Sequence, residues 1–288
     1  MPHTSRAPWH DYRSRCIYML TLRKSASVPD FGQLVGEKIE LSETGRFVKR
    51  QIGLIPLLDR AFRVLQFSIM PDHVHILLFV QSILEESLGK YIARFKIGVN
   101  QRAGGIPVFE EGFNDQILMK ERSLDTLFNY IRDNPRRLAV RKAHPEYFRR
   151  VNGLDIEGKR YSVYGNLFLL HNPFREQVVI HRADNADVRA ANRDRWLYTA
   201  ANGGVLVSPF ISSAEKAVRT EAEEAGAKII LITNEQMGER YKPTGREFRL
   251  CESGRLLIVS VPGPGSLTRR ACLEMNALAK AIAANKPL

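Results

Sequence analysis

Residues 62–80 contain two apolar runs separated by Pro71-Asp72, and this stretch constrains the fold more strongly than any other. Proline followed by aspartate favours a turn, so the two runs are predicted to be β-strands that meet there. The second run, HVHILLFV, begins with His73 and His75. Residues two apart in a strand point to the same face, and the two imidazoles are therefore predicted to emerge side by side.

Two explanations fit a pair of neighbouring histidines on one strand. Buried neutral imidazoles need hydrogen-bond partners, because each unsatisfied group costs roughly 1 to 3 kcal/mol. The pair can therefore be two core histidines whose hydrogen bonds are satisfied. It can also belong to a metal site, since imidazole binds many divalent ions, but such a site needs further ligands and a substrate. The spacing is common and does not decide between the two explanations.

The composition fits a two-domain protein of the cytoplasm. At 288 residues the chain is long for one compact domain, and each of two domains could bury a sizeable core. No stretch approaches the roughly 20 apolar residues of a membrane span, and the N-terminal residues lack the apolar region of a signal peptide. The three cysteines, Cys16, Cys251 and Cys272, show no CxxC spacing, which argues against a zinc finger or a redox motif. We expect a cytoplasmic protein that does not associate with membranes.

The net charge of +12 indicates a polyanionic partner, most strongly for the first half of the chain. The excess of Lys and Arg over Asp and Glu is larger in residues 1–150 than in residues 151–288. Seven basic residues cluster near the end of that first half: Arg132, Arg136, Arg137, Arg141, Lys142, Arg149 and Arg150. Such a run is often only a solvated face. A nucleic-acid backbone is the sharper alternative, because each neutralised phosphate releases counterions and adds salt-dependent affinity.

The order of predicted elements in the first half indicates a small α+β sandwich. Residues 15–22 are predicted to form a strand, and a helix is predicted to start after Ser42, which precedes apolar residues at helical spacing. Further helices are predicted over about 83–100 and 123–133. With the strand pair described above, these elements predict a central antiparallel sheet packed against helices.

The character of the sequence changes near residue 150. Residues 151–200 mix Gly, Asn and Asp with short apolar pieces and a predicted helix near 185–201, and we interpret them as a connector. Residues 201–288 alternate Val/Ile/Leu strands with helices, a pattern typical of a parallel sheet covered on both faces. We therefore expect one domain over residues 1–150 and an α/β domain over residues 201–288.

A tyrosine and an asparagine lie one helical turn apart in the stretch SLDTLFNYIRDNPRR. Tyr130 and Asn134 are four residues apart, so a helix would project the phenol and the carboxamide from one face about 6 Å apart. The helix is predicted to end close to Asn134, because Pro135 disfavours the helical conformation in the residue before it.

These motifs resemble those of the single-tyrosine HUH transposases, and in particular the REP-associated tyrosine transposases. The matching stretches are MPDHVH and, about 55 residues later, YIRDNPRR, while LSETGRFVKRQI is similar to the family's segment between its first two strands. The resemblance covers about residues 15–150. It implies a ferredoxin-like HUH nuclease domain with a central antiparallel sheet.

The resemblance also implies a role for each motif residue. His73 and His75 would bind a divalent ion, Mg²⁺ or Mn²⁺, with Asn134 as a third ligand. Tyr130 would be the nucleophile and form a phosphotyrosyl ester that a free 3′-OH can reverse. The residues expected to bind DNA are Arg132, Arg136, Arg137, Arg141 and Lys142.

The function implied by the resemblance is metal-dependent, tyrosine-mediated cleavage and rejoining of single-stranded DNA, as in DNA transposition and recombination, with hairpin ends among the substrates. The alternative is a DNA-binding or regulatory protein that keeps the HUH scaffold without turnover. The sequence leaves open whether Tyr130 acts in its own subunit or across a homodimer. The chain departs from the family at Tyr18-Met19, where the first strand usually carries an aromatic residue and a histidine, and no role is assigned to Met19.

The C-terminal part has a looser resemblance to the Rossmann-like domain of DNA-processing protein A, through GGVLVSPFISSAEKAV, KIILITN and RLLIVSV. In that family the domain binds single-stranded DNA. Helix N-termini that follow strands offer free N–H groups to an anion, so Ser212, Ser213, Gly263 and Gly265 are predicted to bind phosphate. Ordinary helix starts, including a capping box at Ser212, are the alternative. A nucleotide-sensing domain that controls the nuclease is a third interpretation.

Overall fold

The computed structural model describes residues 7–118, 123–238, 241–263 and 266–284. The chain is a mixed α+β protein with two compact units, Met1–Val140 and Arg141–Leu288. Each unit has its own apolar core. Within the described residues, no helix combines the length and the apolar character needed to cross a membrane.

The first unit is built on an antiparallel sheet. Its described strands are β1 (Cys16–Arg23), β4 (Phe62–Ile69), β5 (His73–Val80) and β6 (Asn114–Ile117), which lie in the order β4-β5-β1-β6. β4 and β5 pair across the predicted Pro71-Asp72 turn, which confirms that strand pair. A separate hairpin of β2 (Gly32–Val35) and β3 (Lys38–Leu41), which we had not predicted, comes before the first helix.

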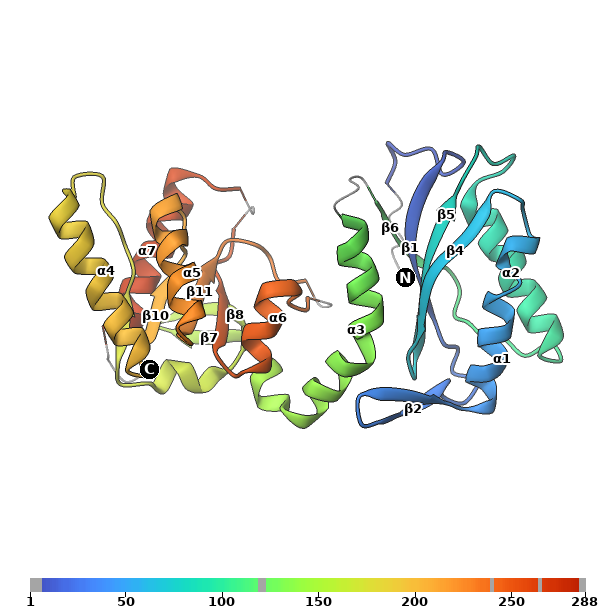
Figure 1. Ribbon diagram of the computed structural model, residues 1–288, viewed down its shortest axis with the longest axis horizontal. Helices are drawn as coiled ribbons and strands as arrows, with labels where there is room; N and C mark the ends of the chain where they lie inside the picture. The colour runs from blue at the N-terminus through green and yellow to red at the C-terminus, as the bar shows by residue number, and fades with distance from the viewer. Residues whose placement is uncertain (1–6, 119–122, 239–240, 264–265, 285–288) are drawn as a thin grey trace. The chain divides into compact units, whose positions relative to one another are not determined.

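Helices cover both faces of this sheet, as Figure 1 shows. α1 (Glu43–Ile52) and α2 (Leu88–Arg102) lie on one side, and α3 (Ser123–Ala143) lies on the other. A short 3₁₀ helix, η1 (Ile55–Leu57), follows α1. Side chains of the central strands alternate between the two faces of the sheet. Leu20 and Ile76 join the core beneath α1 and α2, whereas Leu77 packs with Leu127 and Ile131 of α3.

The predicted start of α1 is confirmed by its cap. Ser42 is the N-cap residue, and its side-chain oxygen accepts a hydrogen bond from the backbone N–H of Gly45 at 3.1 Å. This bond satisfies one of the N–H groups that a helix leaves unpaired in its first turn. The same first turn lies against the backbone of Phe31, because a Cβ at position 45 would come within 1.7 Å of the Phe31 carbonyl oxygen.

The prediction that the tyrosine helix ends near Asn134 is wrong. α3 continues to Ala143 with Pro135 inside it. An internal proline removes one backbone hydrogen bond and costs about 3 kcal/mol, so the prediction followed the local rule. The helix persists because its buried face packs on the sheet, where Ile131 is fully buried and Asn134 is only 4% exposed.

The second unit contains a mixed sheet with a parallel centre. Its described strands are β7 (Arg149–Ile156), β8 (Lys159–Gly165), β9 (Arg175–Gln177), β10 (Val205–Ser208), β11 (Lys228–Thr233) and β12 (Leu256–Ser260). The order is β7-β8-β12-β11-β10-β9. β9 to β12 are parallel to one another, whereas β8 is antiparallel to β12 and β7 is antiparallel to β8.

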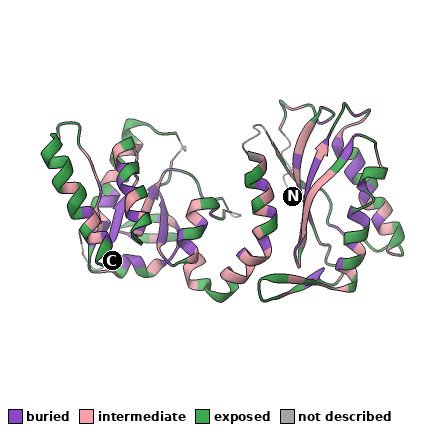
Figure 2. Ribbon diagram, in the orientation of Figure 1, coloured by how far each residue is buried: buried purple, intermediate pink, exposed green. Residues whose placement is uncertain are grey.

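Helices cover both faces of the second sheet, as predicted for a parallel sheet of this composition. α7 (Arg269–Ala283) packs on one face, and α4 (Ala186–Ala201), α5 (Ser213–Glu224) and α6 (Gly245–Glu252) pack on the other. The 3₁₀ helices η2 (Pro145–Phe148) and η3 (Leu167–His171) join the elements at its start. Figure 2 shows buried residues concentrated on the strands between these helices, because both faces are covered.

The prediction that residues 151–200 form a connector needs correction. These residues supply most of β7, all of β8 and β9 and nearly all of α4, and the division between the units falls after Val140 instead of near residue 150. The sequence does not reveal these strands because β7 exposes many of its side chains, with Gly153 interrupting it, and because β9 has only 3 residues. Only pairing with β12, about 100 residues later, makes β8 a buried strand.

Gly45→Ala is predicted to destabilise the first unit, because the added Cβ would collide with the Phe31 carbonyl. Overpacking of this kind costs about 1 to 3 kcal/mol. Gly98→Ala, inside α2, is the matched control: the Cβ there meets only the flexible end of Arg102 at 3.0 Å, and alanine favours a helix by about 0.5 to 1 kcal/mol. Urea unfolding of both variants measures the difference. Equal midpoints would contradict the close approach at Gly45.

Candidate functional site

The histidine pair lies on the face of β5 that α3 covers. His73 and His75 alternate with Val74 and Ile76, which are buried in the core on the opposite face. The prediction that the two imidazoles emerge side by side is confirmed, since their ring centroids are 4.7 Å apart. In the register between β1 and β5, Thr21 is directly opposite His75.

The two imidazoles converge through their Nε2 atoms, which are 3.1 Å apart. Their Nδ1 atoms face other partners: that of His73 is 2.7 Å from Oδ1 of Asp72, and that of His75 is 2.9 Å from Oγ1 of Thr21. An ionised carboxylate can only accept, so Asp72 fixes the hydrogen of neutral His73 on Nδ1 and leaves the Nε2 lone pair free. Each ring is thus held with its Nε2 directed at the same point.

This geometry fits two chemical states. In the first, His75 carries its hydrogen on Nε2 and donates it to His73, which makes the pair self-satisfied. In the second, both Nε2 lone pairs bind one cation. A metal–nitrogen distance of about 2.1 Å, as for Zn²⁺, separates two ligands at right angles by about 3 Å, close to the observed 3.1 Å. Ligating histidines also commonly donate their other N–H to a carboxylate, as His73 does to Asp72.

α3 brings three side chains of one helix face to this region. The ring of Tyr130 meets the ring of His75 edge to face, with centroids 5.8 Å apart. Arg137 also lies over the phenol ring, with its guanidinium carbon 5.1 Å from the ring centroid. Asn134, four residues from Tyr130, shares this face. The structure therefore brings together His75 and Tyr130, which lie 55 residues apart in the sequence.

Whether a metal ion fits beside the histidine pair depends on Asn134. Its side chain is buried, and the amide Nδ2 has no hydrogen-bond partner. An unused buried amide group needs an explanation, and a half-turn of the amide would exchange Nδ2 for the carbonyl oxygen that hard cations prefer. Among the described residues, no three His, Cys, Asp or Glu side chains gather around one point. A third protein ligand here would have to be of another residue type, and the buried amide of Asn134, on the helix face that carries Tyr130, has the chemistry to serve.

The basic residues predicted to bind DNA have different environments. Arg132 is exposed and donates to Asn129 at 2.6 Å, whereas Arg136 pairs with Asp133 at 2.7 Å. Arg137 is only 5% exposed and stacks on Tyr130, so its guanidinium belongs to the tyrosine's surroundings instead of to an open DNA surface. Arg141 and Lys142 end α3 in the second unit, and Lys142 is exposed.

The predicted phosphate site at the start of α5 is already filled by a side chain of the protein. The capping box is confirmed: the Ser212 hydroxyl accepts from the N–H of Glu215, and the Glu215 carboxylate accepts from the N–H of Ser212. The same carboxylate also accepts from the N–H groups of Ile211 at 2.9 Å and Ile180 at 3.1 Å. Glu215 is buried, and it occupies the position where an anion would bind beside Ser213.

The second predicted phosphate turn is only partly described. Gly265 lies outside the described residues. Gly263 is tied by its carbonyl, which accepts from Nε2 of Gln236 at 3.0 Å, and a Cβ at this position would meet nothing within 4 Å. The structure therefore gives no close approach that would require glycine there, and the turn's phosphate role stays a prediction.

Three neighbours of the histidines were not identified from the sequence. Asp72 precedes the first histidine in MPDHVH, so its place beside the ring follows from adjacency. Thr21 and Arg23 are opposite His75 and His73 only because β1 pairs with β5 in this register. A strand-pairing register is not visible in a single sequence, and this is why we missed them.

The comparisons with known proteins give only distant likenesses. No protein-family model matches the chain. An uncharacterised protein of Haemophilus influenzae is 24% identical over 154 residues, which cover 45% of this chain and 86% of that protein. A solved structure of a REP-associated tyrosine transposase bound to a REP hairpin is similar over 46% of this chain and 74% of that chain, with 13% identity and a TM-score of 0.37. A TM-score this low does not establish a common fold.

Glu215→Gln is predicted to lower the free energy of unfolding of the second unit by about 1 to 3 kcal/mol, because it replaces charge-assisted bonds to three backbone N–H groups. Glu224→Gln, on an exposed position of the same helix, is the control and should change the stability by less than about 0.5 kcal/mol. Thermal unfolding compares the two. A Glu215 variant as stable as the wild type would show that the carboxylate is not needed at this helix start.

Proposed function

We propose that the first unit is a metal-dependent nuclease that uses Tyr130 to cleave and rejoin single-stranded DNA, in the manner of the HUH transposases. The observation that carries the proposal is the convergence of His73 and His75 through their Nε2 atoms next to the phenol of Tyr130. A histidine pair that only satisfies its own hydrogen bonds would account for the contact between the two Nε2 atoms. It would not account for the tyrosine, the buried arginine and the unsatisfied asparagine on the helix face that covers the pair.

The topology of the first unit supports the same proposal. The strand order β4-β5-β1-β6, with α1 and α2 following β1 and β5, is the βαββαβ order of a ferredoxin-like sheet. α3 adds the tyrosine on the face that those two helices leave uncovered. For the second unit, the parallel strands β9 to β12 covered on both faces support a Rossmann-like arrangement, extended by the antiparallel β8 and β7.

His73, His75 and Asn134 would hold the cofactor, a divalent ion such as Mg²⁺ or Mn²⁺. When bound, the ion would supply Lewis acidity toward a non-bridging phosphate oxygen. Asp72 and Thr21 keep the two rings in the orientation that this binding needs. The buried position of His75 limits the number of waters that could compete with the substrate.

Tyr130 would supply the nucleophile. Its Oη forms a bond to the phosphorus of a DNA phosphodiester while the bond from phosphorus to the 3′-oxygen breaks. The phenolic proton leaves Oη, and the departing 3′-oxygen takes up a proton to become a free 3′-OH. The 5′ side of the break is then joined to Tyr130, and attack by a 3′-OH reverses the step. Arg137 lies over the ring and holds it through a cation–π contact.

The remaining basic residues would hold the DNA backbone. Arg132 is exposed on α3 two residues before Asn134, and Arg23 is exposed at the end of β1 opposite His73. Phosphate contacts of this kind give affinity that falls steeply with salt. The alternative of a DNA-binding protein without turnover shares these contacts and differs only in the reaction of Tyr130.

His75→Ala and His73→Ala are predicted to weaken the binding of Mn²⁺ by at least about tenfold each, since even loss of a residue that supports a ligand costs 10- to 100-fold. Isothermal titration of the purified protein measures this without any assay of activity. His171→Ala, an exposed histidine of the second unit, is the control and should bind as the wild type does. Unchanged Mn²⁺ affinity in folded His73 and His75 variants would refute the metal site.

Tyr130→Phe is predicted to abolish both DNA cleavage and a covalent protein–DNA adduct while keeping DNA binding, because it removes only the hydroxyl. Single-stranded hairpins incubated with Mg²⁺ or Mn²⁺ give the assay, and mass spectrometry locates the adduct. Tyr198→Phe, at an exposed tyrosine of α4, should leave cleavage intact. An adduct on another tyrosine would overturn the assignment. DNA binding with no cleavage by the wild type would favour the protein without turnover.

A further inference from the structure

A groove runs along α7 at the β9 edge of the second sheet. Its volume is about 1280 Å³, and its walls are one side of α7 and the segment 177–182 that ends β9 and follows it. Gln177 ties these walls together, because its Nε2 donates to the carbonyl of Asn276 at 2.9 Å. Arg175, two residues earlier, donates to the carbonyl of Ile282 nearer the end of α7. The residues after Gln177 therefore run toward the first turns of α7.

This place in the fold suits a ligand. β9 and β10 are parallel, and the segment after Gln177 leaves the carboxyl end of β9. In open α/β sheets, ligands bind in crevices outside the carboxyl ends of the strands. The groove opens at that edge, and it is large enough for a ligand of nucleotide size.

The charges that line the groove are positive. Arg182, Arg269 and Lys280 contribute three cations, and His181 is beside the first of them. In the part of the chain that the structure describes, none of the three cations forms an ion pair. The acidic residue in the lining is Glu215, whose carboxylate is turned toward the backbone N–H groups of Ile180, Ile211 and Ser212.

Two arginines close to the groove are paired with carboxylates instead of lining it. Arg270, next to Arg269 on α7, pairs with Glu274 at 2.9 Å. Arg195 pairs with Glu176, just before the groove begins. Among the described residues, the two cations of α7 without an ion pair are Arg269 and Lys280, and both line the groove, where an anionic group of a ligand would meet them.

The middle of the groove has a different chemistry. Leu273, which is 62% exposed, and Ala277 offer an apolar surface opposite Val179. Asn276 also lines the groove, and its Oδ1 is buried and has no hydrogen-bond partner. A ligand that fits has an anionic end and an apolar or flat part.

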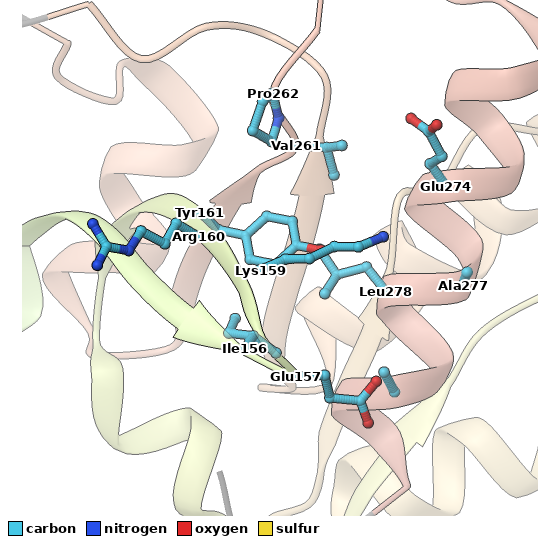
Figure 3. Close-up of a pocket in the computed structure, with 11 residues that line it drawn as sticks. Ile156, Glu157, Lys159, Arg160, Tyr161, Val261, Pro262, Glu274, Ala277 and Leu278 are labelled. Carbon is cyan, nitrogen blue, oxygen red and sulfur yellow. The ribbon is translucent and has the colours of Figure 1, made fainter.

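A second hollow, on the side of α7 that faces the β7-β8 hairpin, lacks this pattern. It has a volume of about 450 Å³ and is lined by side chains of both signs, and Ala277 lies between the two hollows. In Figure 3, Lys159 extends toward α7 between the carboxylates of Glu157 and Glu274, while Arg160 points away. The mixed charges make this hollow an internal control for the groove.

We propose that the groove along α7 binds a nucleoside phosphate, with the phosphate at Arg182 and Arg269 and the nucleoside against Leu273 and Asn276. The phosphate chemistry has two sources, a free nucleotide and the terminal phosphate of a DNA strand. The site is independent of the proposed reaction at Tyr130, because every residue that forms it belongs to the second unit.

Equilibrium titration of the full-length protein tests the proposal with six probes: AMP, ATP, adenosine, inorganic phosphate, an oligothymidine with a 5′-phosphate and the same oligothymidine without it. We expect saturable binding of a nucleotide, at least about tenfold weaker binding of adenosine, and loss of affinity as salt is raised. Preference for AMP or ATP assigns the free nucleotide. Preference for the 5′-phosphorylated oligonucleotide assigns the strand end.

Matched variants locate the binding. Arg182→Ala combined with Arg269→Ala should weaken the nucleotide by at least about tenfold, as expected when two charge-assisted contacts are lost. Arg270→Ala, the paired neighbour on α7, and Lys159→Ala, in the second hollow, should bind within about twofold of the wild type. Tyr130→Phe should also bind normally, which separates this site from the proposed nuclease.

Two results would overturn the proposal. One is that no phosphate-bearing probe binds saturably to the folded wild-type protein. The other is that the double arginine variant, shown by circular dichroism and thermal unfolding to be folded, binds nucleotide as tightly as Arg270→Ala does. Asn276→Asp supplies an independent check: it adds a negative charge beside the apolar centre and should weaken the binding without removing either arginine.

Discussion

The candidate site depends on the two-sided burial of β5. Val74 and Ile76 are fully buried on one face, and this fixes the orientation of the histidines that alternate with them. A slip of one residue would turn both imidazoles into the apolar core and expose the aliphatic side chains. Burying a polar group without a partner costs a few kcal/mol, so such a slip is strongly disfavoured. Pairing with β1 then sets Thr21 against His75 and holds the ring. The chemistry of the site is thus positioned by the packing of the opposite face.

α3 shows how tertiary packing overrides a local rule. A proline inside the helix costs about 3 kcal/mol, whereas full burial of one Leu or Ile side chain contributes about 1.5 to 3 kcal/mol. Leu127 and Ile131 precede the proline and pack on Leu77 of the sheet, which together is enough to offset the loss. Continuation of the helix past Pro135 also places Arg137 over Tyr130. The misjudged helix end and the unexpected environment of Arg137 have the same cause.

Much of the first unit could be predicted because its signals are local. The Pro71-Asp72 turn, the alternation along β5 and the cap at Ser42 are each contained within a few residues, and the structure has all three. The spacing of Tyr130 and Asn134 likewise predicts a shared helix face. The strands β7 to β9 gave no such signal, because they are partly polar and because β8 is completed by a partner far away in the sequence. Their role follows from pairing, which no single stretch records.

The predicted phosphate site at the start of α5 shows a second limit of what a local sequence pattern can predict. A pattern such as Ser212 to Glu215 predicts a helix start correctly, but it does not say whether the exposed N–H groups remain available. Here Glu215 accepts from three of the surrounding N–H groups, so the protein's own carboxylate meets the positive end of the helix. With that carboxylate occupied, the cations of the neighbouring groove have no acidic partner among the described residues. The helix start and the groove are therefore linked, because the carboxylate that could balance the groove's cations accepts hydrogen bonds at the helix start instead.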